Sequence, residues 1–146
     1  MKMTQAICAL MLGMAATGCS TFNREWKMAA TEPRPVNDIT GPWEGSWNSD
    51  KNGHSGNLRC LLSKIDDTHY RARYKATYRK IMRFGYTLAM NVKHGTDNAY
   101  NFQGEADLGW WAGGVYHYEG QITSTNFVST YKSKYDQGTF RMKRPE

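Results

Sequence analysis

From Gly41 onward, hydrophobic and polar residues alternate with a period of two, the pattern of a strand with one buried face. The clearest stretch is Tyr70–Arg79, where tyrosine and alanine alternate with arginine, lysine and threonine. A helix turns once in about 3.6 residues and would scatter these tyrosines around its axis. The stretch therefore predicts an amphipathic β-strand.

The same alternation recurs along the rest of the chain, at residues 43–48, 57–65, 84–92, 100–106, 116–122, 127–131 and 139–143. The connections are short and contain turn-forming residues, as in Asp66-Asp67, Lys93–Asn98 and Asp136-Gln137-Gly138. We therefore expect an all-β domain of about eight antiparallel strands in an up-and-down meander. Closing the meander into a small barrel would remove its exposed edges.

Glycine recurs inside these strands after an aromatic residue and an acid or amide, and before a polar and an apolar residue. This pattern is found at Trp43–Trp47, Phe102–Ala106 and Tyr118–Ile122. Glycine within a strand permits sharp coiling or a close approach of two backbones. We interpret these glycines as corners of the barrel.

The N-terminus has Lys2 followed by the apolar stretch Ala6–Ala16, which is shorter than the roughly 20 residues that span a bilayer. Residues 1–18 therefore predict a cleavable signal peptide. The sequence Ala16-Thr17-Gly18-Cys19 resembles the lipobox of bacterial lipoproteins. The resemblance implies diacylglyceration of the Cys19 thiol, cleavage just before Cys19, and anchoring in a membrane by several acyl chains, usually three, with palmitate among them. The alternative is a plain secretory signal that ends at an unrelated cysteine.

Ser20 stands where retention in the inner membrane typically requires Asp, so the lipobox resemblance implies the outer membrane, with the domain facing the periplasm. Residues 19–40 are expected to form a lipidated N-terminus and tether, with one or two helical turns at 23–30, and residues 41–146 to form the domain. If Cys8 is removed and Cys19 lipidated, Cys60 has no disulfide partner and is expected to be buried.

Gly41-Pro42-Trp43 and Gly45-Ser46-Trp47 both resemble the Gly-x-Trp of the first strand in lipocalin-like (calycin) barrels. In that superfamily a basic residue from the last strand packs over the tryptophan at the closed end. The resemblance implies a barrel-closing group made of Trp43, Trp47, Arg141 and Arg144. A competing resemblance to MORN-type repeats is disfavoured by the irregular spacing of the glycines.

The chain has 146 residues, 40% hydrophobic and 22% charged, which is typical of one globular domain and argues against disorder or several membrane spans. The net charge of +6 is compatible with an anionic membrane or polysaccharide, and in a secreted protein nucleic acid is not expected as a partner. A basic surface row is predicted on one strand, at Arg71, Arg73, Lys75 and Arg79. It either binds anionic envelope components or is simply a solvated outer face.

No catalytic motif is present. The four histidines (His54, His69, His94 and His117) lack metal-ligand spacing, and Glu105 and Asp107 are expected on the solvent face. The sequence thus predicts no enzyme, no metal site and no cofactor.

Trp110-Trp111 is followed by Ala112-Gly113-Gly114, between two expected strands, which predicts a loop at the barrel mouth. Two function classes follow. In the first, the barrel binds a small apolar or amphipathic ligand at Trp110, Trp111, Tyr74, Tyr78, Tyr86 and Tyr118. In the second, the barrel is filled, and the lipoprotein has a structural or assembly role through its basic outer surface. An open interior cavity would distinguish the two classes.

Overall fold

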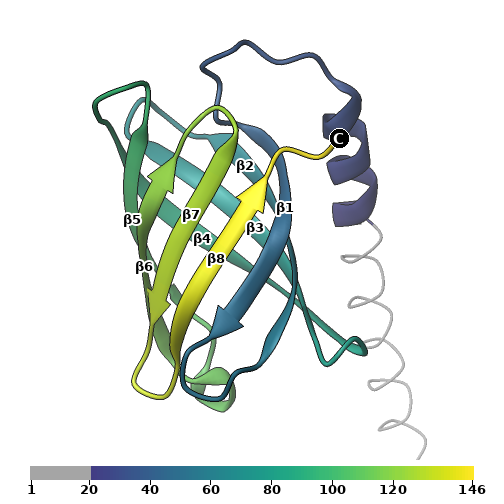
Figure 1. The fold of residues 1–146 in the computed structure, drawn as a ribbon, viewed down its shortest axis with the longest axis vertical. Coiled ribbons are helices and arrows are strands. Elements are labelled where there is room, and N and C mark those ends of the chain that lie inside the picture. The colour runs from purple at the N-terminus through teal and green to yellow at the C-terminus, as the bar shows by residue number, and fades with distance from the viewer. Residues whose placement is uncertain (1–20) are drawn as a thin grey trace, which may run out of the picture. The chain divides into compact units, whose positions relative to one another are not determined.

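The computed structural model describes residues 21–146 (Figure 1). The expected signal peptide and the expected lipidation site, Cys19, lie outside the described residues. Residues 21–31 are helical, and the chain divides into two compact units at Glu32/Pro33. The second unit, Pro33–Glu146, contains the strands β1 (Gly41–Ser49), β2 (Ser55–Lys64), β3 (His69–Tyr78), β4 (Met82–His94), β5 (Tyr100–Asp107), β6 (Val115–Ile122), β7 (Asn126–Lys132) and β8 (Gln137–Lys143), with one 3-10 turn, η1 (Trp110–Ala112).

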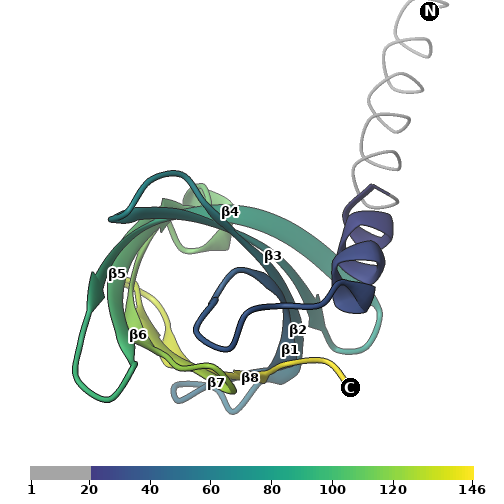
Figure 2. The same ribbon diagram turned by 90° about the horizontal axis from the view of Figure 1, so that it is seen from above.

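Each strand pairs antiparallel with the next along the chain, and β8 pairs back with β1 from Glu44↔Lys143 to Ser49↔Gly138. The sheet is therefore a closed, up-and-down, eight-stranded barrel, as the ring of strands in Figure 2 shows. This confirms the fold class expected from the alternating pattern. All backbone edges are paired around the ring over most of its height, so the barrel has little free edge to expose.

Side chains that alternate along each strand point in turn to the inside and the outside of the barrel. On β3 the side chains of Tyr70, Ala72, Tyr74 and Ala76 are buried, while the intervening residues are exposed or half-buried. Aromatic and small residues thus fill the interior, and the charged residues face outward. The stabilisation comes from removing this apolar surface from water, at roughly 25 cal/mol per Å².

Two of the strand glycines allow the backbones of neighbouring strands to approach closely. A Cβ on Gly45 would lie 1.9 Å from the carbonyl oxygen of Arg141, and one on Gly120 would lie 2.0 Å from that of Val128. No side chain fits there without moving a strand, which explains glycine in the repeated pattern. Gly138 lies within β8 and likewise allows a close approach, to the carbonyl oxygen of Asn48. The prediction of a turn at residues 136–138 is therefore wrong, because the turn is formed by residues 133–136.

The connections divide the barrel into two ends. At what we call the closed end lie the β2–β3, β4–β5 and β6–β7 connections and the segment 33–40, which crosses the end of the ring (Figure 2). Ile39 of this segment is buried in the core. The compact unit that contains the barrel begins at Pro33, and the residues between Pro33 and β1 help to close the barrel. The other four connections form the open end (Figure 1).

Candidate functional site

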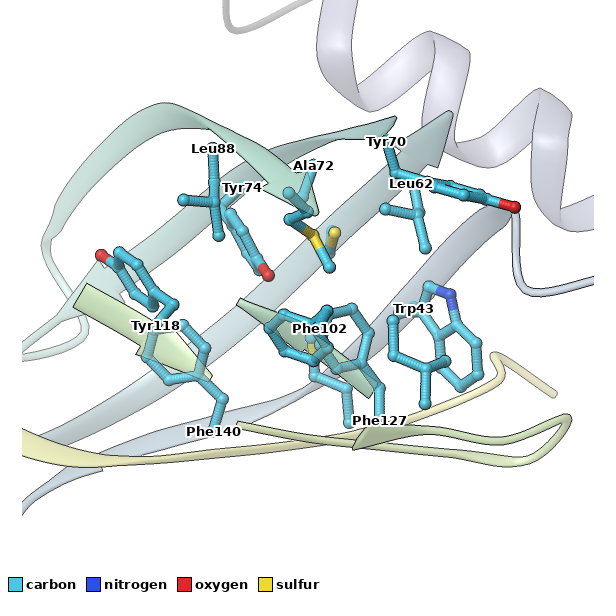
Figure 3. Close-up of a cluster of buried hydrophobic side chains, with 14 of the residues drawn as sticks. Trp43, Leu62, Tyr70, Ala72, Tyr74, Leu88, Phe102, Tyr118, Phe127 and Phe140 are labelled. Atoms are coloured by element: carbon cyan, nitrogen blue, oxygen red, sulfur yellow. The ribbon is translucent and has the colours of Figure 1, made fainter. Parts of the chain in front are cut away.

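The closed end is filled with side chains that pack around Trp43. Its ring is fully buried and meets Phe127 edge to face at 5.6 Å between centroids, and Phe127 meets Phe102 in the same way at 5.3 Å (Figure 3). The indole Nε1 donates a hydrogen bond to the carbonyl oxygen of Ile39, 3.0 Å away. Edge-to-face contacts of this kind add about 0.5–1.5 kcal/mol per pair to the burial of the rings. This half of the interior is a solid core.

Arg144 covers Trp43 from the outside. Its guanidinium carbon lies 3.9 Å from the centroid of the indole ring. The guanidinium also donates hydrogen bonds to the carbonyl oxygens of Asp38 (2.6 Å), Thr40 (2.7 Å) and Pro42 (3.2 Å). Burial lowers the pKa of Arg144 to about 10, so the group is still a cation at neutral pH. Arg144 thereby ties the last strand to the segment that closes the barrel.

The other two members of the expected barrel-closing group lie elsewhere. Arg141 is exposed on the outer face of β8, opposite Ser46 and Val128. Trp47 lies four residues further along β1, near the open end. Its Nε1 donates a hydrogen bond to the carbonyl oxygen of Thr77, 3.0 Å away. The alternation of side chains along a strand explains both positions. Arg141 is at a position of β8 that faces outward. Trp47 is four residues from Trp43, so it also faces inward but lies at the other end of the barrel.

The open end contains a cavity of about 430 Å³. Its walls are apolar and aromatic residues from most strands and from η1. The lining residues are Trp47, Leu58, Ala76, Phe84, Gly85, Tyr86, Thr87, Asp107, Leu108, Trp111, Ala112, Tyr116, Tyr118, Tyr131, Asp136 and Phe140. Because Trp111 is 74% exposed and Phe84 is 39% exposed, the cavity reaches the surface at these side chains.

A series of stacked tyrosine rings forms one wall and the floor. Tyr74 stacks on Tyr86 at 4.9 Å between centroids, and Tyr86 stacks on Tyr118 at 6.2 Å. Burial raises the pKa of all three phenols, so they remain neutral hydrogen-bonding groups at physiological pH. The wall thus offers flat aromatic surface together with hydroxyl groups.

The Tyr74 hydroxyl is buried beneath the cavity and has no oxygen or nitrogen partner among the described residues. The Cys60 thiol, a weak hydrogen-bonding group, lies beside it. Burial also raises the pKa of this thiol, the free cysteine of the described chain. Cys60 is therefore an inert part of the core, which agrees with the sequence interpretation.

The barrel wall is open between β4 and β5 at this end. Pairing of these strands begins only at Ala89↔Glu105, whereas β4 already pairs with β3 from Met82 onward. Lining residues come from both sides of the unpaired stretch: residues 85–87 on β4, and Asp107 and Leu108 after β5. The cavity is consequently accessible along the side of the barrel as well as beneath η1.

Two carboxylates stand at the cavity mouth. Asp107 Oδ1 accepts a hydrogen bond from the Gly109 backbone N–H at 2.9 Å. Asp136 accepts hydrogen bonds from the Ser49 and Tyr131 hydroxyls. These two carboxylates place negative charge directly beside the cavity mouth, while the interior is apolar.

The residues expected to bind a ligand are only partly brought together. Trp111, Tyr86 and Tyr118 line the cavity, and Tyr74 supports Tyr86 from below. Tyr78 instead stacks on Trp47 at 6.2 Å, with its hydroxyl 2.9 Å from His54 Nδ1.

Trp110 is 91% exposed and does not line the cavity. The sequence interpretation missed several lining residues: Leu58, Phe84, Leu108, Tyr116, Tyr131 and Phe140. Most of them are at strand positions that face inward. The alternating pattern therefore predicts that they lie inside the barrel, but it does not predict that they line one cavity.

Three residues of the expected basic row lie on the outer face of β3, with Arg71 exposed and Arg73 and Lys75 half-buried, whereas Arg79 is exposed in the turn that follows this strand. The Arg79 guanidinium carbon is 5.3 Å from the Tyr78 ring centroid. The row does not contribute to the cavity.

Other ionisable side chains form pairs on the surface. His117 contacts Glu105 across β5 and β6 at 2.8 Å, and His69 contacts Asp66 at 2.9 Å. A backbone hydrogen bond from Thr68, followed by the His69 side chain, lowers the pKa of Asp66 to about 2. In residues 21–146, no three His, Cys, Asp or Glu side chains gather in a way that would hold a metal ion.

The fold and the site together define the class: a small, closed, eight-stranded antiparallel barrel that is solid at one end and hollow at the other. No protein-family model, curated protein or solved structure matches the chain. Within residues 21–146, no helix has the length and apolar character needed to cross a membrane.

Proposed function

We propose that this protein is a non-enzymatic lipoprotein of the bacterial envelope whose barrel binds a small apolar or amphipathic molecule at its open end. The observation that carries this proposal is the cavity of about 430 Å³ under Trp111. Ligand sites in proteins commonly measure about 300–1,000 Å³ and have mostly apolar walls with a few polar groups. A filled barrel would have had side chains in this volume.

The walls indicate the chemistry of the ligand. The aromatic and aliphatic side chains of Leu58, Tyr116 and Phe140 in the cavity wall suit a flat ring or an acyl segment. The carboxylates of Asp107 and Asp136 at the mouth disfavour an anionic group there, because like charges repel. The preferred ligand is therefore a neutral or cationic amphipathic molecule.

The location belongs to the same proposal and rests on the sequence. The lipobox-like residues before Cys19 imply a lipid anchor, and Ser20 implies an outer-membrane address facing the periplasm. Globomycin, an inhibitor of lipoprotein signal peptidase, should cause the unprocessed precursor to accumulate in cells that express the full chain. Cys19→Ser should abolish labelling of the chain with radioactive palmitate and should block cleavage at this site. Normal processing of Cys19→Ser would contradict lipidation and leave a secreted barrel.

Ligand binding is tested with residues 21–146, which contain the whole closed sheet and every residue of its core. Native mass spectrometry of this chain, purified from cells, should show a bound small molecule. The neutral fluorescent probe N-phenyl-1-naphthylamine should bind with a blue shift. If neither a bound mass nor probe binding is found, the ligand proposal is wrong.

A matched pair of variants assigns probe binding to the cavity. Ala76→Leu adds three carbons to a cavity wall and should weaken probe binding about tenfold, the equivalent of about 1.4 kcal/mol. Ala89→Leu makes the same change on the exposed outer face of β4 and should leave binding unchanged. Equal effects of both changes would place the probe outside the cavity.

The second candidate is a structural or assembly role through the basic outer face, and the row of Arg71, Arg73 and Lys75 on β3 favours it. A lipoprotein of this kind needs no ligand. Absence of probe binding, combined with retention on immobilised peptidoglycan or lipopolysaccharide that Arg71→Glu abolishes, would favour this role.

A further inference from the structure

The large apolar side chains that the barrel exposes are concentrated at its open end. They are Ile81 (85%), Met82 (56%), Phe84 (39%), Trp110 (91%), Trp111 (74%), Val115 (45%) and Tyr135 (65%). All lie in or beside the β3–β4, β5–β6 and β7–β8 connections. At the closed end, the described residues expose two large apolar side chains, Ile65 (54%) in the β2–β3 connection and Val36 (82%) in the segment 33–40. Exposed tryptophan and isoleucine together in such numbers mark a contact surface.

The β3–β4 hairpin is built to project. Residues 82–88 of β4 pair with β3 and not with β5, and the turn between β3 and β4 contains Arg79, Lys80 and Ile81. Figure 1 shows this hairpin extending away from the ring. Cations flank the apolar tip on both sides: Arg79, Lys80 and Arg83. A short apolar tip within a basic hairpin suits insertion just below the headgroups of an anionic membrane.

The second part of this surface has the same composition. Trp110 and Val115 lie beside Lys132, Lys134 and Tyr135 around a shallow groove. Lys134 Nζ is 5.5 Å from the Tyr135 ring centroid. Tryptophan and tyrosine concentrate at the interface between water and lipid, and lysine next to them can reach the lipid phosphates.

The carboxylates at this end do not cancel the positive charge. Asp107 and Asp136 accept internal hydrogen bonds, and Asp50 is followed directly by Lys51. The cations around them outnumber them: Lys51, Arg79, Lys80, Arg83, Lys132 and Lys134. The surface is therefore apolar at its centre and net positive at its rim, the complement of an anionic lipid surface.

We propose that the open end docks on an anionic phospholipid bilayer, with Ile81, Met82 and Trp110 inserted at the level of the headgroups. Phe84 and Trp111 belong to both the exposed surface and the cavity lining, so docking would present the cavity to lipid. This inference goes beyond ligand binding, because a barrel with an empty cavity would dock equally well. The chain enters the barrel at the closed end, so docking involves the end opposite that attachment.

The test uses unlipidated residues 21–146 and vesicles of phosphatidylcholine with or without one-third phosphatidylglycerol. The chain should sediment with the phosphatidylglycerol vesicles, and brominated lipid should quench its tryptophan fluorescence. Salt should weaken binding, because it screens exposed charges. Failure to bind phosphatidylglycerol vesicles would overturn the proposal.

Two matched pairs of variants locate the docking surface. Ile81→Asp and Ile65→Asp place the same charge in exposed turns at opposite ends. Lys80→Glu with Arg83→Glu, and Lys93→Glu with Lys143→Glu, change the net charge equally at the open and closed ends. The open-end variants should lose about tenfold or more in vesicle affinity, since each cation near such a surface contributes appreciably, and the closed-end variants should retain most of it.

Equal losses at both ends would show attraction by net charge alone and would overturn the assignment to the open end. A dimer that Ile81→Asp dissociates, without vesicle binding by either form, would instead make the surface an interface between two copies. Ile81 does not line the cavity, so probe binding by Ile81→Asp reports on the ligand proposal separately.

Discussion

The two ends of the barrel are built from the same alternating strands but use their inward residues differently. At the closed end, Trp43, Phe102 and Phe127 interlock and the segment around Ile39 fills the remaining opening. At the open end, Tyr86, Tyr116 and Tyr118 line a volume that nothing fills. Among the described residues, the closed end exposes two large apolar side chains, Val36 and Ile65, whereas the open end exposes seven. One end stabilises the fold, and the other is available for binding.

The difference has a physical origin in what closes each end. Arg144 holds three carbonyl groups of the segment 38–42 over Trp43. At the open end, residues 82–88 of β4 do not pair with β5, and η1 lies over the cavity. An eight-stranded barrel is just wide enough to be filled by side chains or to hold one small ligand. In this protein the closed end is filled, and the open end contains the cavity.

The largest stability effect is expected from Trp43→Ala. Removing a fully buried indole leaves a cavity in the solid half and should lower the free energy of unfolding by about 3–5 kcal/mol. Urea denaturation followed by circular dichroism measures it in residues 21–146. A loss below about 1 kcal/mol would show that the closed end is not the stabilising half.

The next effect is expected from Arg144→Met, which keeps the apolar stem and removes the hydrogen bonds to the three carbonyl groups. The loss should be about 2 kcal/mol, because hydrogen bonds from a charged donor are lost and partly buried carbonyls remain without partners. Arg141→Met on the same strand is the control and should change stability little, since Arg141 is exposed. Similar losses for the two variants would contradict the special position of Arg144.

A third effect concerns alkaline pH and the tyrosine-lined half. Burial raises the pKa of Cys60, Tyr74, Tyr86 and Tyr118 in the folded chain. Above the ordinary values of 9.0 for the thiol and 10.0 for the phenols, the unfolded chain releases these protons and the folded chain keeps them. Stability is therefore fully present below about pH 9 and falls above it, by up to about 1.4 kcal/mol per pH unit for each group.

Urea titrations between pH 8 and 11 should show this decline, and Cys60→Ala should make it shallower from about pH 9. Tyr135→Phe removes an exposed phenol and serves as the control. An unchanged slope in Cys60→Ala would mean that the thiol is not kept protonated by burial.

The smallest stability effect is expected at the cavity mouth. Trp111→Ala should change the free energy of unfolding by less than about 0.5 kcal/mol, because the side chain is 74% exposed. The same change should weaken probe binding several-fold, since Trp111 lines the cavity. Its neighbour Trp110 does not line it, so Trp110→Ala should bind the probe normally. Equal effects on probe binding would mean that the cavity does not discriminate between the adjacent tryptophans.

Local pattern predicted the strands well where the alternation is strict. Tyr70–Arg79 corresponds to β3 within one residue at each end, and its inward residues are those expected. The pattern failed at Gln137 and Gly138, because a glycine two residues after an aspartate is typical of a turn. In the structure Gly138 is needed in β8 for a close approach to the Asn48 carbonyl on β1. Such a contact between distant strands leaves no local signal.

The candidate site was predictable in its parts but not in its arrangement. Inward parity identified Tyr86 and Tyr118, and the two glycines after Trp111 indicated a loop. Tyr78 was assigned to the ligand site by the same parity, yet it lies beside Trp47 and His54 at the rim. The alternating pattern tells which face of a strand a side chain is on, but not how far along the barrel axis it lies. That position depends on the register of each strand relative to its neighbours.

By itself, the sequence determined that the chain forms an antiparallel barrel, which residues face inward, and that a tryptophan loop lies between two strands, because these follow from local periodicity and turn chemistry. Only the tertiary structure decided that the barrel is solid at Trp43 and hollow at Tyr118. It also decided that Arg144 rather than Arg141 covers Trp43, and that the exposed apolar residues gather at one end. These features depend on strand register and closure, which bring together residues about 100 positions apart, such as Arg144 and Thr40.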